Sequence, residues 1–249
     1  MLFWPKGSTK NGISRREVTE FFKSFVIFPK FRIFAEFWKR IVPNTSYISL
    51  RDKFIEYGCF SIYQVLMWDP GFDSNNYTRW CRQGLLVRLR RGWFAFPELL
   101  KAPDFARYIA NRIYKPSYIS LQTALSFYGM IPEAVTDITS VSTLKTAEFI
   151  NKFGTYSYRT IKPELFFGFE LKKMQDGRTI PFASPEKALL DFLYLYPEYN
   201  NAASMLDLRL DEDFMINELN LERIKEYASQ FESKALDARL STLLRAYGL

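Results

Sequence analysis

The chain has 249 residues, which is enough for one large domain or two small ones, and it carries a net charge of +7. It contains no histidine, which excludes His-based catalytic triads, imidazole general bases and His-ligated zinc. Its two cysteines, Cys59 and Cys81, are too few for a zinc site of their own. Their small number suits a reducing cytoplasm, and we expect both to be small buried apolar side chains.

The positive charge is concentrated in the first hundred residues. Residues 1–47 hold nine Lys and Arg against three Glu, and residues 48–101 hold eight basic against five acidic side chains. The remainder holds seventeen against nineteen and is slightly acidic. An anionic partner is therefore expected to contact the N-terminal part of the chain.

Residues 1–47 form a basic, aromatic-rich extension whose role the residues leave open. Lys23, Pro29, Lys30 and Arg32 interrupt its apolar runs, so no stretch approaches the ~20 residues of a membrane span. We weigh an unordered extension from an early start codon, a packed native arm, and an arm that contacts a membrane surface.

Three short helices are predicted between residues 48 and 84. Helical spacing of apolar residues predicts helices over 50–58 and 60–68, with Ser61 as a plausible N-cap of the second. The segment 69–74 has turn composition, and a third helix is expected over Asn75–Gln83, ended by Gly84.

A basic β-hairpin follows these helices. In LLVRLR (85–90) Val87 and Leu89 alternate with Arg88 and Arg90, the period of a half-solvated strand. Arg91-Gly92 makes the turn, and WFAF returns as the partner strand. Three helices and a hairpin within residues 48–100 predict a winged helix-turn-helix.

Residues 101–249 are predicted to be a mixed α/β domain with a helical tail, so the chain as a whole is assigned to the α+β class. Ser184-Pro185-Glu186 is a strong helix start, and Asp176-Gly177 is a hairpin turn. The expected elements are helices over 103–114 and 120–129, strands over 137–143, 152–162 and 168–183, a helix from Ser184 to Pro197, and a helical tail over 202–247.

The helix 75–83 and the hairpin together predict a surface that binds duplex DNA. Tyr77, Trp80 and Cys81 fall on one helical stripe, which is expected to anchor the helix. Asn and Arg on the other stripe can bind adenine and guanine edges, while hairpin arginines neutralise phosphates. The alternative is a solvated polar face on a domain that binds protein. The predicted DNA contacts are Asn75, Asn76, Thr78, Arg79, Arg82, Arg88, Arg90 and Arg91.

We assign no catalytic, cofactor-binding or metal-binding residue and expect no enzymatic activity. Asp137 followed by Glu170-Leu171-Lys172 matches the pattern of a Mg²⁺-dependent nuclease, but three common residues with free spacing arise often by chance. Asp191 lies on a mostly apolar helix and is expected to be a structural anchor. No glycine-rich phosphate-binding loop is present in the sequence.

The hairpin LLVRLRRGWFAF after a short helix, followed by a long helical segment and SPEKALLDFLY (184–194), resembles the AbiEi-type antitoxins. These are predicted transcriptional regulators of bacterial abortive-infection (phage defence) systems, in type IV toxin–antitoxin pairs. The resemblance covers about residues 48–249. It implies a winged helix that binds inverted repeats in its own promoter, with DNA-contact roles for Asn75 to Gln83 and Arg88 to Arg91.

The same resemblance implies a C-terminal antitoxin domain and, as functional partner, a nucleotidyltransferase toxin that is opposed without a stable complex. We therefore expect a cytoplasmic DNA-binding regulator with no membrane association and leave its oligomeric state open. The alternatives are a Mg²⁺-dependent nuclease targeted by the winged helix and a protein–protein adaptor.

Overall fold

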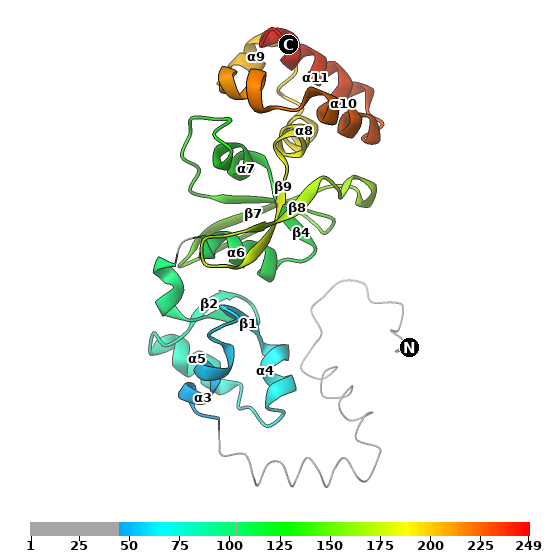
Figure 1. Cartoon of the computed structure of the whole chain (residues 1–249). Helices are drawn as coiled ribbons and strands as arrows, with labels where there is room; N and C mark the ends of the chain where they lie inside the picture. The colour runs from blue at the N-terminus through cyan, green and yellow to red at the C-terminus, as the bar shows by residue number, and fades with distance from the viewer. Residues whose placement is uncertain (1–44, 103) are drawn as a thin grey trace.

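The computed structural model describes residues 45–102 and 104–249. The predicted extension lies outside the described residues except for its last three positions. Helices and two sheets make up the described chain, which confirms the α+β class. Figure 1 shows them in sequence order from the three-helix unit at one end to a group of helices at the other.

The N-terminal unit combines three short helices with a small antiparallel sheet. Its strand order is β1-β3-β2, so the predicted hairpin β2–β3 gains a third strand from the segment between the first two helices. The elements are α3 (Tyr47–Phe54), β1 (Cys59–Ser61), α4 (Ile62–Trp68), α5 (Asn75–Arg82), β2 (Val87–Arg90) and β3 (Trp93–Ala95).

Local chemistry explains where these helices begin and end. Ser61 and Gln64 form a reciprocal capping box at the start of α4, which confirms the predicted N-cap. Asp73 accepts a hydrogen bond from the backbone of Asn75 at 2.9 Å, at the start of α5. Gly84 follows α5 with φ +74°, a left-handed conformation that glycine adopts without strain, and turns the chain into the hairpin.

The C-terminal part is built on a six-stranded mixed sheet of order β6-β7-β5-β4-β9-β8. β6–β7, β4–β5 and β8–β9 are antiparallel pairs, whereas β5–β7 and β4–β9 are parallel. The strands are β4 (Ser117–Ile119), β5 (Ile138–Ser142), β6 (Ala147–Asn151), β7 (Gly154–Thr160), β8 (Phe169–Lys173) and β9 (Thr179–Ala183).

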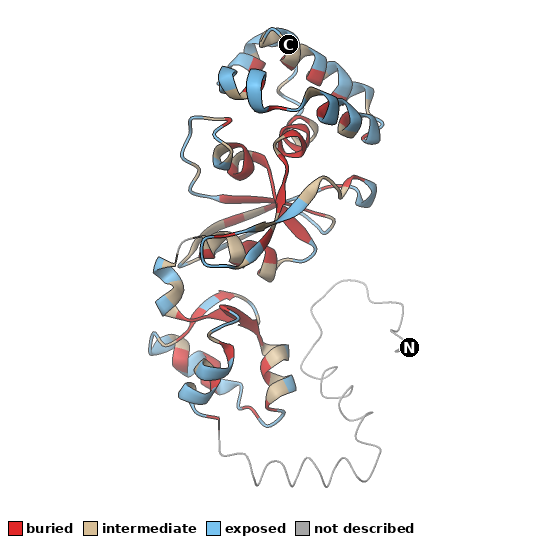
Figure 2. Ribbon diagram, in the orientation of Figure 1, coloured by how far each residue is buried: buried red, intermediate tan, exposed pale blue. Residues whose placement is uncertain are grey.

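Helices cover the sheet and extend beyond it. α6 packs on β4, β5 and β9, α7 packs on β5 and on α8, and α10 and α11 pack on α8. The helices are α6 (Phe105–Ile113), α7 (Leu121–Phe127), α8 (Pro185–Leu195), α9 (Ala202–Leu206), α10 (Leu221–Gln230) and α11 (Lys234–Ala246), with 3₁₀ turns η1 (Pro97–Lys101) and η2 (Pro163–Leu165) and a π-helical turn η3 (Phe214–Glu218). Figure 2 shows that α8 is buried along most of its length.

α8 carries a buried ion pair between Lys187 and Asp191, whose side chains have no exposed surface. Asp191 also accepts hydrogen bonds from Tyr118 Oη at 2.9 Å and Ser120 Oγ at 2.8 Å. Burial opposes both charges: it lowers the pKa of Lys187 and raises that of Asp191, and the contact between the two opposes each shift. Asp191 therefore joins α8 to the strand β4, as expected of a structural anchor.

The small sheet of the N-terminal unit is covered on both faces. One face packs with the helices in a core that includes Phe60 and Phe94. The other face contributes Val87, Leu89 and Ala95 to the large core of the C-terminal part. The hydrophobic core is consequently continuous across the predicted domain boundary near residue 100.

Candidate nucleic-acid interface

The helix α5 is held in place by an aromatic cluster. Tyr77 stacks on Phe94 with ring centroids 4.6 Å apart and planes 6° apart, and it lies 4.8 Å from Phe72. Trp80 lies 5.8 Å from Phe72 and 5.7 Å from Tyr47. Burial raises the pKa of Tyr77, and the nearby Asp69 adds to the effect. The predicted apolar stripe therefore fixes α5 to the hairpin strand β3.

The opposite side of α5 presents polar and basic side chains to solvent. Asn75, Thr78, Arg79 and Arg82 are all exposed, as predicted. No acidic residue occurs within α5, so nothing on the helix itself repels an anion. The Arg79 guanidinium lies 5.9 Å from the centre of the Trp80 ring, which holds it beside the helix surface.

Asn76 is the exception on this helix. The sequence places it four residues before Trp80, and such pairs share a face. The structure leaves Asn76 only 4% exposed, together with Tyr77 and Trp80. Our expectation that Asn76 lies on the exposed stripe is wrong, and its side chain is not available to a base edge.

The strand β2 contains a bulge that separates the two arginines expected to share a face. Arg88 pairs with Phe94, whereas Arg90 pairs with Trp93, so one extra residue is inserted between them. Arg88 is exposed, and its guanidinium lies 5.8 Å from the Phe94 ring. Arg88 therefore stays on the side of the sheet that faces the helices.

Arg90 turns toward the C-terminal part. Its guanidinium lies 5.7 Å from the Tyr114 ring and 5.3 Å from the Phe149 ring. The residue is half-buried, and desolvation lowers the pKa of its guanidinium. The expectation that Arg90 is exposed on the same face of the hairpin as Arg88 is wrong, because the bulge and the packing of β2 beside β6 direct it inward.

The hairpin turn is exposed at Arg91. Gly92 follows with φ +76°, and its carbonyl accepts a hydrogen bond from Ile62 N at 3.0 Å. This bond ties the tip of the hairpin to the first residue of α4, and the side chain of Arg91 stays exposed beside it.

The turn between β6 and β7 adds a basic residue that sequence reasoning missed. The Asn151 amide donates to the Leu89 carbonyl at 3.2 Å, which holds this turn against β2. Lys152 is exposed there. Burial raises the pKa of the Cys81 thiol, and the nearby charges of Arg88 and Lys152 oppose this rise. Lys152, Arg88 and α5 thus converge around Cys81.

The nuclease pattern is not assembled into one site. Asp137 precedes β5 and Glu170 lies on β8, with β4 and β9 between these strands. A strand spacing of about 4.8 Å puts their backbones about 14 Å apart, too far for one ion to bind both carboxylates. Lys172 points its ammonium to Tyr128 Oη, 3.2 Å away. In residues 45–102 and 104–249, no three His, Cys, Asp or Glu side chains gather as metal ligands.

Among the described helices, none combines the length and apolarity needed to cross a membrane. No protein-family model matches the chain, and no curated protein matches it either.

Proposed function

We propose that the protein is a DNA-binding transcriptional regulator, in which residues 45–96 form a winged helix. The support is one arrangement: α5 is anchored by Tyr77 and Trp80 and presents Asn75, Thr78, Arg79 and Arg82 to solvent, with no acidic residue on the helix. A rigid helix with exposed Asn and Arg side chains suits the major groove, where these residues form bidentate pairs with adenine and guanine.

Phosphate contacts are assigned to the cations that flank α5. Arg88 and Arg91 on the hairpin and Lys152 on the β6–β7 turn are exposed. Such side chains provide affinity and set the position of the protein on the duplex but read no sequence. Arg90 and Asn76 are left out of the proposed contact set because the fold uses their side chains.

The proposal is tested by fluorescence anisotropy with a duplex from the region upstream of the gene and a scrambled duplex of equal length. Arg79→Ala or Asn75→Ala should reduce the preference for the native duplex, by about 5- to 150-fold for each bidentate pair lost. Arg159→Ala is the matched control, because Arg159 is exposed on β7, away from α5. Equal affinity of the unmodified protein for both duplexes would contradict sequence-specific regulation.

The resemblance to the AbiEi-type antitoxins extends the proposal to a cytoplasmic antitoxin that represses its own promoter at inverted repeats. Its functional counterpart would be a nucleotidyltransferase toxin, opposed without a stable complex. Co-expression in a bacterial host tests this role: the chain should restore growth that the toxin gene encoded beside it inhibits. Failure of rescue alongside intact DNA binding would limit the function to regulation.

A further inference from the structure

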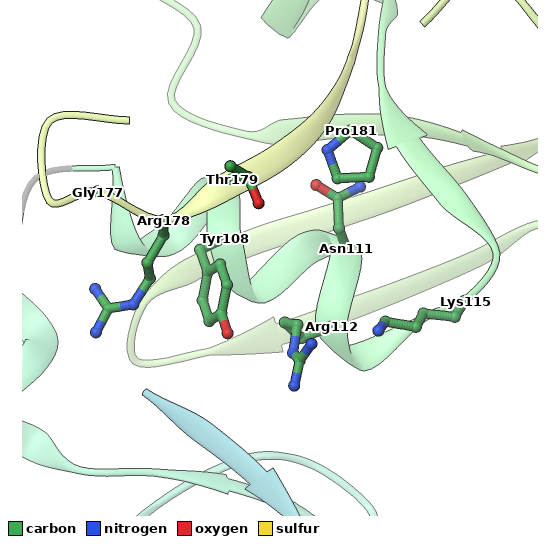
Figure 3. Close-up of a pocket in the computed structure, with 8 residues that line it drawn as sticks. All are labelled: Tyr108, Asn111, Arg112, Lys115, Gly177, Arg178, Thr179 and Pro181. Carbon is green, nitrogen blue, oxygen red and sulfur yellow. The ribbon is translucent and has the colours of Figure 1, made fainter. Parts of the chain in front are cut away.

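We infer that a pocket beside α6 is a binding site for a phosphorylated small molecule. The pocket has a volume of about 410 Å³ and is lined by Tyr108, Asn111, Arg112, Lys115, Arg178 and Thr179, among others. Figure 3 shows that these side chains come from α6, from the segment just after it, from the turn that connects β8 to β9, and from the start of β9. This site is separate from the proposed DNA contacts and does not depend on them.

The lining is strongly cationic. Arg112, Lys115 and Arg178 all border the pocket, and no Asp or Glu lines it. Arg178 has an ion pair with Asp176, whereas within residues 45–102 and 104–249 neither Arg112 nor Lys115 has one. Partial desolvation of its ammonium group lowers the pKa of the otherwise exposed Lys115, and the neighbouring Arg112 charge lowers it further. An anion between these two side chains would relieve their mutual repulsion.

Unsatisfied polar atoms mark the same place. Arg112 Nε is buried and has no hydrogen-bond partner among the described residues, and the same is true of Asn111 Oδ1. Asn111 is held by its own amide, which donates to the Ser117 carbonyl at 3.1 Å. A buried donor without a partner costs stability, and a guanidinium is well suited to phosphate. Asn111 Oδ1 can accept a hydrogen bond from a hydroxyl or amino group on the remainder of the ligand.

Aromatic stacking holds the cations in position before a ligand arrives. The Tyr108 ring lies 5.6 Å from the Arg112 guanidinium and 5.2 Å from that of Arg178. Tyr108 Oη donates to the Tyr57 carbonyl at 3.0 Å, so the ring is fixed at both ends. Preorganised side chains lose little entropy when they bind. A volume of about 410 Å³ exceeds what a phosphate ion needs and lies in the range of small-molecule sites.

The ligand class follows from these features. It has one phosphate group for Arg112 and Lys115 and a small polar body that reaches Asn111. A nucleoside monophosphate or a sugar phosphate fits this description, and separate titrations with one of each distinguish the two ligand classes.

Isothermal titration calorimetry of the full chain tests the site with AMP, ribose 5-phosphate, inorganic phosphate and adenosine. We expect saturable binding of at least one phosphate ester, stronger than that of inorganic phosphate, and none of adenosine. Arg112→Met and Lys115→Met should each weaken ester binding by about tenfold or more, because each removes a charge-assisted hydrogen bond. Lys101→Met, at an exposed lysine that does not line the pocket, should leave it unchanged.

Lys115 is exposed, so its substitution does not disturb the core. If Arg112→Met fails to fold, Lys115→Met still tests the site. Absence of binding by every phosphate probe would overturn the inference, as would unchanged affinity in Lys115→Met. Displacement of the phosphate ester by a short DNA duplex in the unmodified chain but not in Lys115→Met would also overturn the inference. The pocket would then bind a nucleic-acid phosphate.

Discussion

The two arginines on either side of the β2 bulge should differ in how they respond to salt. Each phosphate that a protein neutralises contributes about 0.9 to the slope of log K against log salt. Arg88 is exposed, so Arg88→Gln should reduce the slope by about 0.9, and the double variant Arg88→Gln/Arg91→Gln by about 1.8. Arg90→Gln should leave the slope unchanged, because its guanidinium lies on Tyr114 and Phe149.

The measurement is duplex affinity by fluorescence anisotropy between 50 and 200 mM salt, a fourfold range over which a slope of 0.9 corresponds to about a 3.5-fold change in K. Arg90→Gln should act on folding instead and lower the free energy of unfolding in urea by about 1–2 kcal/mol, through lost cation–π contacts. A slope that falls equally in Arg88→Gln and Arg90→Gln would refute the assignment of the two side chains to different faces. An unchanged slope in the double variant would remove the hairpin from the interface.

Three further outcomes are expected. Tyr77→Ala should lower the free energy of unfolding by about 3–5 kcal/mol in urea titration, because it empties a buried aromatic site; a loss below 1 kcal/mol would contradict the stacking with Phe94 as an anchor. A thiol reagent at pH 8 should label Cys81 well before Cys59, since burial raises the pKa of Cys59 to about 11 and encloses it; mass spectrometry showing the reverse order would count against this packing. Asp191→Leu alone should cost about 3–5 kcal/mol by leaving the Lys187 charge buried, and adding Lys187→Met should recover most of it; equal losses in the single and double variants would disprove a coupled pair.

Most helices of this fold were predictable, because their ends are determined by local chemistry. Ser61 and Ser184 cap the helices that they were expected to cap, and Gly84 and Gly129 take the left-handed conformation after theirs. The hairpin β8–β9 also follows from its turn at Gly177. These signals lie within a few residues of the elements that they control, so they can be read from one segment at a time.

The missed strands depend on partners that are distant in the sequence. β1 and β4 are three residues long, and each is stabilised by pairing with strands contributed by other segments. β6, which is five residues long and pairs with β7, was also missed, and with it the position of Lys152 beside β2. Short strands carry too few residues for a periodic pattern, so tertiary pairing decides them.

The site was predicted in part for similar reasons. The exposure of Arg79 and Arg82 follows from helical phase, and the same phase relation to Trp80 could have identified Asn76 as buried. The bulge before Arg90 has no local signal in the sequence, and the packing of β2 on β6 is a contact between distant segments. The strict alternation of apolar and basic residues in the sequence therefore predicted one arginine too many on the exposed face of the hairpin.

The burial of both faces of the small sheet limits how its N-terminal unit can be handled in isolation. A fragment ending at residue 102 would expose Val87, Leu89 and Ala95 as an apolar row on the outer side of three short strands. Exposed apolar rows of this kind promote self-association. A fusion of this fragment to an unrelated reporter protein would therefore report self-association as well as DNA binding. In the full-length chain these apolar side chains are buried against the C-terminal part.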